Sequence, residues 1–144
     1  MDFTTSTLAS YLEDGEIPCA KALRRMLEAG VDPGQITFTS DGQGSLPDWD
    51  RNGRLQDISV GRVTSLFPAV REAVQAEGLA LETALRVITA NPARILKLRS
   101  KGQLAPGMDA DVVLLSKDLE VRSVVAKGQL LMKAGRPLTK GRFE

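Results

Sequence analysis

The chain has 144 residues, with 19 Lys and Arg against 18 Asp and Glu, one Cys and no His. Without an imidazole it cannot build a Ser-His-Asp or Cys-His nucleophile or a His-based zinc site, and one Cys excludes a disulfide framework and a multi-Cys metal cluster. The net charge of +1 favours neither nucleic acid nor a membrane surface as a partner. No stretch approaches the ~20 apolar residues of a membrane span, and the first residues lack the basic start of a signal peptide, so we expect a cytoplasmic protein.

The first forty residues predict a strand, a helix and a second strand. β-Branched and hydroxyl residues from 2 to 7 indicate a strand, and apolar residues recur at helical spacing between Pro18 and Gly30. Residues 36–39 are again β-rich and follow a turn signal. Because the connections are short, this order predicts a βαβ unit with parallel strands.

A polar loop is expected between Gly42 and about Gly61. Asn52-Gly53 is typical of the tip of a hairpin, here between Trp49 and Ile58. The residues from 48 to 53 also match the first six positions of an EF-hand calcium loop. The twelfth position is Ser59 rather than Glu, so the pattern disfavours calcium.

In the second half of the chain, segments with helical spacing are followed by segments with β-rich composition. Two helices are predicted, one from Val63 to Val74 that Gly78 closes and one through Leu81, Leu85 and Ile88. Asn91 is expected to cap a short helical turn that begins with Pro92. From residue 101 onward, three antiparallel strands are expected at residues 112–115, 121–125 and 129–132.

Asp41 ends the second predicted strand and is followed by Gly42, Gly44 and Ser45. In β/α barrels the carboxyl ends of the strands, and the loops that follow them, carry the active site. The two glycines allow close approach of the backbone to a ligand. From local spacing alone, an Asx-turn in which Asp41 caps its own loop is an equally good interpretation.

The remaining polar features favour structural roles. Asp109 and Asp111 should point to one face of a turn that leads into the β-rich region. Cys19 has no His to activate it and is interpreted as a packing residue. The C-terminal basic side chains lack interleaved aromatics and indicate a solvated surface rather than a nucleic-acid site; they are Lys127, Lys133, Arg136, Lys140 and Arg142.

Two motifs together resemble a known enzyme family. Residues 91–96 (Asn-Pro-Ala-Arg-Ile-Leu) and 102–114 (Gly-Gln-Leu-Ala-Pro-Gly-Met-Asp-Ala-Asp-Val-Val-Leu) resemble the segment where metal-dependent amidohydrolases leave their barrel and enter a small β domain. Residues 40–45 (Ser-Asp-Gly-Gln-Gly-Ser), with Pro47 and the hairpin at 50–58, narrow the resemblance to the isoaspartyl (β-aspartyl) dipeptidases.

The resemblance implies an α/β fold of which this chain is the C-terminal fragment. Residues 1–100 correspond to the last two strands and terminal helices of a TIM-like (β/α)8 barrel. Residues 101–144 correspond to part of a small β-sandwich domain. The parent reaction that the resemblance implies is hydrolysis of the β-aspartyl peptide bond in dipeptides.

The same resemblance implies roles for four residues. In such dipeptidases two zinc ions are held by histidines, a carboxylated lysine and an aspartate after the last barrel strand, and Asp41 matches that aspartate. It would ligate the more buried metal, take the proton of the attacking hydroxide and deliver it to the leaving amine. Ser45 matches a substrate-binding serine, and Gly42 and Gly44 shape its loop.

The departures from the family predict an incomplete enzyme. The histidine ligands are missing, so the chain alone is expected to hold no zinc and to be inactive. Two strands of a barrel leave unpaired edges, so the chain should associate, aggregate or be partly ordered, and either a complementing N-terminal barrel chain or a homo-oligomer is an expected partner. Alternatives are a fragment of an N-acyl-amino-acid deacylase or dihydroorotase-like cyclic amidase, or a non-catalytic interaction module.

Overall fold

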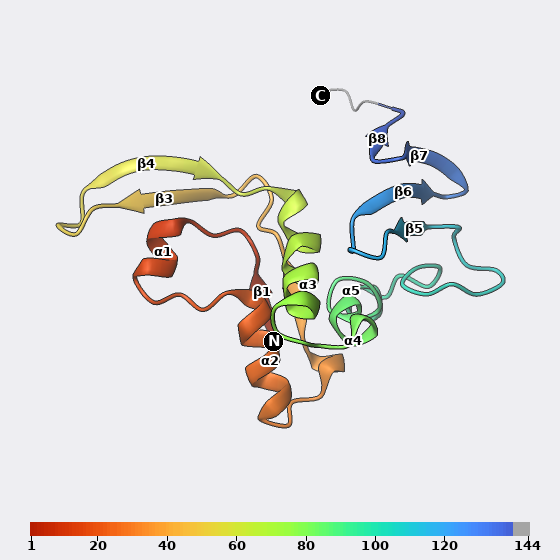
Figure 1. The fold of residues 1–144 in the computed structure, drawn as a ribbon, viewed down its shortest axis with the longest axis horizontal. Coiled ribbons are helices and arrows are strands. Elements are labelled where there is room, and N and C mark those ends of the chain that lie inside the picture. Colours follow the sequence, from red (N-terminus) through yellow and green to blue (C-terminus); the bar gives the residue numbers. More distant parts are fainter. Residues whose placement is uncertain (140–144) are drawn as a thin grey trace. The chain divides into compact units, whose positions relative to one another are not determined.

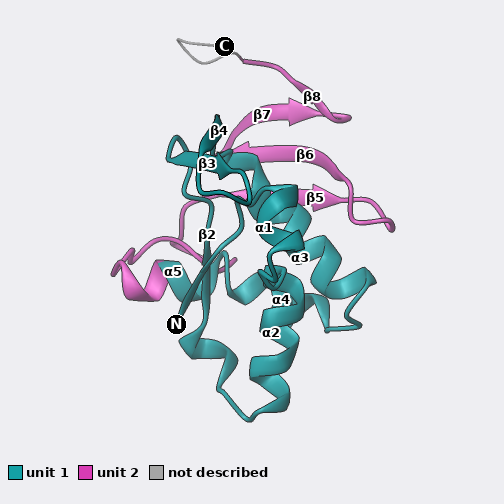
Figure 2. Ribbon diagram, turned by 90° about the vertical axis from the view of Figure 1, so that its left-hand side faces the viewer, with its two compact units in different colours: residues 1–92 teal, residues 93–144 magenta. Residues whose placement is uncertain are grey.

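The structure is a computed structural model that describes residues 1–139. Its elements are β1 (Asp2–Thr4), α1 (Ala9–Glu13), α2 (Cys19–Glu28), η1 (Pro33–Gln35), β2 (Thr37–Thr39), β3 (Ser45–Trp49), β4 (Leu55–Val60), η2 (Val63–Ser65), α3 (Leu66–Gln75), α4 (Leu81–Arg86), α5 (Ala90–Ile95), β5 (Val112–Leu115), β6 (Val121–Ala126), β7 (Gln129–Lys133) and β8 (Arg136–Pro137) (Figure 1). Two compact units divide the chain between Pro92 and Ala93 (Figure 2). Across the described residues, no helix has the length and apolar character needed to cross a membrane.

The predicted βαβ unit is confirmed. β1 and β2 pair in parallel, with Asp2 opposite Thr37 and Thr4 opposite Thr39, and α2 lies between them in the sequence. The Asp2 carboxylate accepts hydrogen bonds from the hydroxyls of Thr37 at 2.5 Å and Thr39 at 2.7 Å. These side-chain bonds fix the register of a strand pair that is only three residues long.

The first strand is shorter than predicted. β1 ends at Thr4, whereas the β-rich composition continues to Thr7. The Thr5 amide still donates to the carbonyl of Thr39 at 2.7 Å, but Ser6 turns its hydroxyl toward the carbonyl of Ser40. Hydroxyl side chains that bond to nearby backbone compete with a regular ladder, which explains the early end of the strand.

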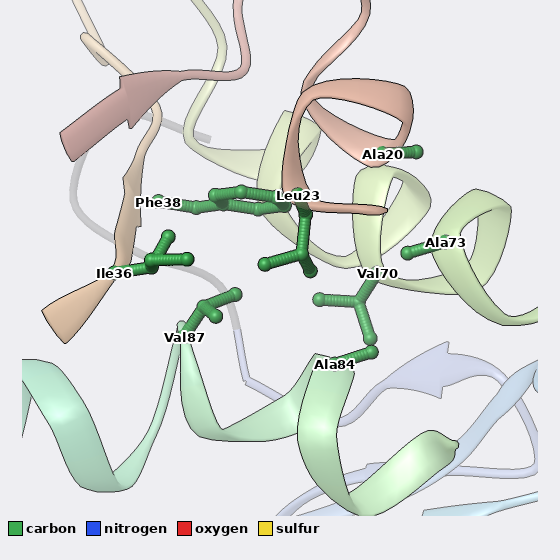
Figure 3. Packing of buried hydrophobic residues seen from close by; sticks show 8 residues of the cluster. All are labelled: Ala20, Leu23, Ile36, Phe38, Val70, Ala73, Ala84 and Val87. Atoms are coloured by element: carbon green, nitrogen blue, oxygen red, sulfur yellow. The ribbon is translucent and has the colours of Figure 1, made fainter. Parts of the chain in front are cut away.

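The apolar core of the first unit lies between the helices and β2. Leu23, Ile36, Val70 and Val87 are fully buried and Phe38 is 3% exposed. Figure 3 shows Leu23 of α2 among side chains that come from β2, α3 and the segment after α4. Burial of one large aliphatic side chain stabilises a fold by about 1.5–3 kcal/mol, so this cluster holds the two strands against the helices.

The helix boundaries agree with the sequence in most places. Gly30 follows α2 with a φ of +83°, as predicted for a glycine that ends a helix. The predicted helix from Val63 begins instead as the 3-10 turn η2 and becomes α-helical at Leu66. Gly78 follows α3 with a φ of +71°, and the amide of Leu79 then donates to the Ala73 carbonyl at 3.0 Å.

Most of the expected polar loop is a regular hairpin. β3 and β4 pair antiparallel from Ser45 opposite Val60 to Trp49 opposite Leu55, with a bulge after Asp48. The predicted tip is confirmed, since Gly53 has a φ of +73°. The hairpin is longer than the predicted span from Trp49 to Ile58, since the pairing extends to Ser45 and Val60 at its base.

Helix α1 is an element that the sequence pattern did not predict. It has five residues, none of them buried, and no side chain caps its start. Its Tyr11 hydroxyl donates to the Pro47 carbonyl at 2.5 Å, which links α1 to β3. A helix this short depends on such tertiary contacts, because isolated short helices are marginal in water.

The expected role of Asn91 as a helix cap is wrong. α5 already begins at Ala90, and Asn91 is 2% exposed. Its side-chain amide donates to the carbonyls of Pro33 and Ile36, both at 2.7 Å. Asn91 therefore links the start of α5 to the backbone that leads into β2.

The second unit contains the predicted antiparallel strands and a short fourth one. The sheet order is β5-β6-β7-β8, with register shifts between β5 and β6 and between β6 and β7. Asp109 and Asp111 do share one side, since the Lys101 ammonium bonds to both carboxylates. Asp111 also accepts from the Lys127 amide at 2.7 Å. Two basic residues of the predicted surface, Lys140 and Arg142, lie outside the described residues.

Candidate functional site

The candidate site lies at the carboxyl edge of the parallel strand pair. Parallel strands end at the same edge of a sheet, so the residues that follow Thr4 and Thr39 lie close together. Residues 40–44 turn away from β2 and lead directly into β3. The four predicted site residues, Asp41, Gly42, Gly44 and Ser45, all belong to this one turn or to the first residue after it.

Asp41 is exposed and has a left-handed backbone with a φ of +47°. The Gly44 amide donates to the Asp41 carbonyl at 2.9 Å, which closes the turn. A residue with a Cβ is unfavourable in this conformation, although Asp and Asn tolerate it better than most. The turn therefore places a solvent-accessible carboxylate at the edge of the sheet.

Gly42 and Gly44 are required by close contacts. A Cβ at Gly44 would lie 2.5 Å from the nearest carboxylate oxygen of Asp41, and one at Gly42 would lie 2.4 Å from a methyl of Val63. Atoms at such distances overlap, so a larger residue at either position must displace its neighbour. Gly44 thus leaves the space that the Asp41 carboxylate occupies.

Gly61 also supports the turn, and sequence reasoning missed it. The Gln43 amide donates to the Gly61 carbonyl at 2.9 Å, and the Gly61 amide donates to the Gly44 carbonyl at 2.8 Å. A Cβ at Gly61 would lie 2.2 Å from the Asp41 carbonyl oxygen. The end of β4 is therefore held directly against the Asp41 turn.

A cavity of about 680 Å³ opens beside the turn. Its lining is rich in hydroxyl groups and includes one arginine; the residues are Thr5, Ser6, Thr7, Leu8, Gln43, Leu46, Ser59, Val60, Gly61, Arg62, Val63, Thr64 and Ser65. Sequence reasoning assigned no role to Thr5, Ser6 or Ser65. The available signal was the hydroxyl run at the end of the first strand, on the same edge as Asp41.

Ser45 lies at the start of β3, opposite Val60, and is exposed. Its position follows from the turn, because β3 begins immediately after Gly44. An exposed hydroxyl within a few residues of a carboxylate suits hydrogen bonding to a polar ligand. A ligand that contacts this turn could therefore reach both the Asp41 carboxylate and the Ser45 hydroxyl.

Two other candidate groups have structural explanations. The Asp50 carboxylate accepts the amides of Asn52 at 2.8 Å and Arg54 at 2.9 Å, which closes the hairpin tip. Cys19 is half-buried, and its thiol donates to the Thr4 carbonyl at 3.0 Å. Burial, reinforced by nearby carboxylates, raises the pKa of Cys19 to about 11, so the thiol is protonated near neutral pH.

The described residues do not bring together the ligands of a complete zinc site. Among residues 1–139, no three His, Cys, Asp or Glu side chains lie close enough together to hold a metal ion. Protein-bound zinc takes about four ligands, and Asp41 offers one carboxylate. Residues 1–139 therefore do not fit a complete metal centre, and the exposed carboxylate of Asp41 could serve at most as one ligand.

The sequence matches a known family over most of its length. Residues 16–131 match the amidohydrolase family. The fold is similar to that of a β-aspartyl dipeptidase from Fervidobacterium islandicum AW-1, whose crystal structure holds a β-Asp-Leu dipeptide. The TM-score is 0.77 at 36% identity, over 88% of this chain and 32% of that one.

Curated relatives have other activities. Human N-acetylglucosamine-6-phosphate deacetylase is 37% identical over 75 residues, which are 51% of this chain and 18% of that protein. Adenine deaminase 2 of Jannaschia sp. is 35% identical over 120 residues, which are 81% of this chain and 17% of the deaminase. The chain thus spans less than a fifth of either relative. Its match to the family model and its mixed helix and strand content, shared with solved relatives of the TIM-barrel superfamily, show that it belongs to the amidohydrolase family.

Proposed function

We propose that the chain is the C-terminal portion of an isoaspartyl dipeptidase-like amidohydrolase. Residues 1–100 form the last two strands and terminal helices of its (β/α)8 barrel, and residues 101–144 form part of its small β-sandwich domain. The parallel pair β1–β2 and the antiparallel sheet β5–β8 support this division. The identity of 36% to a β-aspartyl dipeptidase over 88% of the chain supports the choice of substrate class.

The observation that carries the proposal is the carboxylate of Asp41 at the carboxyl end of β2. A carboxylate at this edge can accept the proton of an attacking water molecule and return it to a leaving amine. Ser45 binds the dipeptide through its hydroxyl, and Gly42 and Gly44 shape the turn between them. The reaction is hydrolysis of the β-aspartyl peptide bond in a dipeptide.

The chain by itself is inactive in this proposal. Amidohydrolases are typically metal-dependent, and the complete parent enzyme holds two zinc ions. Asp41 supplies one ligand, and the remaining ligands belong to barrel strands outside this chain. Activity therefore requires a companion chain, by which we mean a chain that carries the preceding barrel strands and their histidines. A homo-oligomer could cover the exposed strand edges, but it would supply no histidine.

The curated relatives are consistent with a second proposal, in which the parent enzyme is an amidohydrolase with a different substrate. The deacetylase and deaminase relatives match 51% and 81% of this chain, and their names indicate different substrates. A fragment of an N-acyl-amino-acid deacylase or of a dihydroorotase-like cyclic amidase would have the same carboxylate at the same strand end. Assays with these substrate classes separate the possibilities.

The experiment compares the chain alone with the chain mixed with the companion chain. Zinc content and release of leucine from β-aspartyl-leucine are measured in both. We expect activity only in the mixture and expect Asp41→Ala to abolish it. Activity of the chain alone contradicts the fragment proposal, and a zinc-free, inactive mixture of well-folded chains favours a non-catalytic interaction module.

A single cysteine supports a cytoplasmic location for the enzyme, since the chain has no internal disulfide to protect from reduction. The small net charge of +1 supports a small-molecule substrate over nucleic acid or a membrane surface. Fractionation of cells that express the tagged chain tests the location directly.

A further inference from the structure

Three hydroxyl groups meet at the edge that carries Asp41, and we call them the hydroxyl cluster: Thr5, Ser6 and Ser65. The hydroxyls of Thr5 and Ser65 are 2.6 Å apart, and those of Ser6 and Ser65 are 3.4 Å apart. Thr5 and Ser6 follow β1, whereas Ser65 ends the turn η2 that leads into α3. The cluster therefore joins the end of one strand to the start of a helix.

Ser6 connects this cluster to the Asp41 turn. Its side chain is only 8% exposed, its hydroxyl donates to the Ser40 carbonyl, and it accepts the Arg62 amide at 3.2 Å. A hydroxyl has one proton and two lone pairs, so both bonds can exist at once. The Ser40 carbonyl belongs to the peptide group that immediately precedes the Asp41 α-carbon.

The Asp41 turn needs such support because its backbone is unfavourable. A left-handed conformation brings the Cβ of a residue close to the following carbonyl oxygen, and Asp41 has a φ of +47°. On its far side the turn is held by the backbone bonds to Gly61. On its near side, the Ser6 hydroxyl donates a hydrogen bond to the Ser40 carbonyl.

We propose that Ser6 is a positioning residue for the Asp41 carboxylate. Its hydroxyl, oriented by Ser65 and by the Arg62 amide, ties the end of β1 to the peptide group before Asp41. It acts through Asp41 and does not touch the substrate. This inference rests on the proposed function for its effect on catalysis, while its effect on the turn is independent of that function.

The catalytic test uses the complete enzyme formed with the companion chain. Ser6→Ala should lower kcat by about 10- to 100-fold with KM within about twofold, because a displaced catalytic group affects the transition state more than ground-state binding. Ser6→Thr keeps the hydroxyl and should restore a large part of kcat. Ser10→Ala is the matched control, since the Ser10 hydroxyl is buried with no hydrogen-bond partner among the described residues.

Two outcomes of this test overturn the proposal. One is a wild-type kcat in Ser6→Ala. The other is an equal loss in Ser6→Ala and Ser6→Thr, because the hydroxyl that Ser6→Thr retains would then fail to restore kcat. The folded fraction of each variant is measured by circular dichroism so that a change in kcat is referred to folded enzyme.

Amide hydrogen exchange tests the turn without turnover. The Gly44 amide bonds to Asp41 and the Gln43 amide bonds to Gly61, so both should exchange at least about tenfold faster in Ser6→Ala. The Asp50 amide, which donates to Arg54 at 2.9 Å in the hairpin tip, should not change. Unchanged protection of Gly44 overturns the proposal. Inactive wild-type enzyme with faster Gly44 exchange in the variant instead rejects the proposed function and keeps Ser6 as the anchor of the turn.

Discussion

Gly44 is the single residue on which the place of the Asp41 carboxylate most directly depends. Its backbone is not in the left-handed region, so the obstacle to a side chain is the carboxylate itself, 2.5 Å from the position of a Cβ. We predict that Gly44→Ala displaces this carboxylate and destabilises the unit by about 1 kcal/mol, the cost of a strained side-chain rotamer. Urea unfolding measures the loss.

A double-mutant cycle separates the contact from other effects of Gly44→Ala. In an Asp41→Ala background the carboxylate is gone, and the same substitution should cost less than half as much. Equal costs in the two backgrounds would show that the added methyl meets something other than Asp41. The mixture with the companion chain should also lose activity in Gly44→Ala, because the carboxylate that we propose as the proton acceptor has moved.

Cys19 is predicted to be an unreactive thiol. Its pKa is raised to about 11 from the ordinary value of 9.0, mainly by burial. The thiolate fraction near pH 8 is therefore about 100-fold lower than for a free cysteine, and alkylation by iodoacetamide should be slower by at least that factor. The rate should still rise severalfold between pH 10 and pH 11, where a free thiol with the ordinary pKa of 9.0 has nearly reached its plateau. A plateau below pH 9 contradicts the prediction.

At the scale of elements, Asn91 joins α5 to the segment before β2. Its buried amide satisfies two carbonyls, those of Pro33 and Ile36. Asn91→Ala leaves both carbonyls without this donor and should destabilise the first unit by about 2 kcal/mol. Thermal or urea unfolding of the variant measures the loss, and Asn52→Ala on the exposed hairpin tip is the control.

The substitution Asn91→Asp should make the stability of the first unit depend on pH. A buried carboxylate that faces two carbonyl oxygens has a raised pKa, because burial and the loss of a donor both disfavour its charged form. The variant should therefore be least destabilised below the ordinary carboxyl pKa and should lose stability as pH rises through the raised value. Stability of Asn91→Asp that is constant between pH 4 and pH 8, while Asn91→Ala is unstable, contradicts this assignment.

Lys101 holds together the segment that leads into β5. Hydrogen bonds from its ammonium lower the pKa of Asp109 and of Asp111, and the Lys127 amide adds to the effect on Asp111. A lowered carboxyl pKa contributes stability above the ordinary value of 3.8 and loses it as pH falls through the lowered values. Lys101→Met should raise both pKa values in an NMR titration of the carboxyl carbons. Lys117→Met should leave both unchanged.

The elements differ in how far their own residues determine them. The pattern of α2 predicts its extent well, because Leu23 and its neighbours repeat at helical spacing and Gly30 ends the helix. α1 has no such pattern and depends on the bond from Tyr11 to Pro47. The local sequence predicts that Asn91 caps a helix, but the carbonyls that it binds belong to residues more than fifty positions earlier. Local sequence cannot reveal a partner at that separation.

At the scale of the whole molecule, the chain leaves apolar surface and strand edges uncovered. Within residues 1–139, β1 and β2 pair only with each other. On the hairpin, Trp49, Leu55, Ile58 and Val60 are each about half exposed. Unpaired edges and clustered apolar side chains favour association.

We therefore predict that the isolated chain binds a hydrophobic dye. In size-exclusion chromatography with light scattering, it should have a mass larger than that of a monomer. The companion chain should reduce dye binding and give a defined complex, because it covers the edges of β1 and β2. Addition of an unrelated barrel protein is the control. A monomer that binds neither the dye nor the companion chain would contradict both this prediction and the proposed incompleteness of the barrel.

The candidate site could be predicted from the sequence only in part. Asp41, Gly42, Gly44 and Ser45 are contiguous, so a motif at the end of a β-rich run predicts that they share one turn. Ser6 and Gly61 bind to that turn from positions 34 residues before Ser40 and 20 residues after Asp41. Their roles depend on which strand ends and which hairpin base the fold brings to the same edge.

The sequence by itself determined the class of the chain and the identity of its one candidate ligand. Zero histidines exclude a histidine-based zinc site, a single cysteine excludes a multi-cysteine one, and the order of β-rich and helical segments predicts a parallel pair with Asp41 at its end. Only the tertiary structure decided how the Asp41 carboxylate is held. Its left-handed backbone is stabilised by contacts between the end of β1, the base of the hairpin and the start of α3, and such long-range contacts form only when the core has packed these elements together.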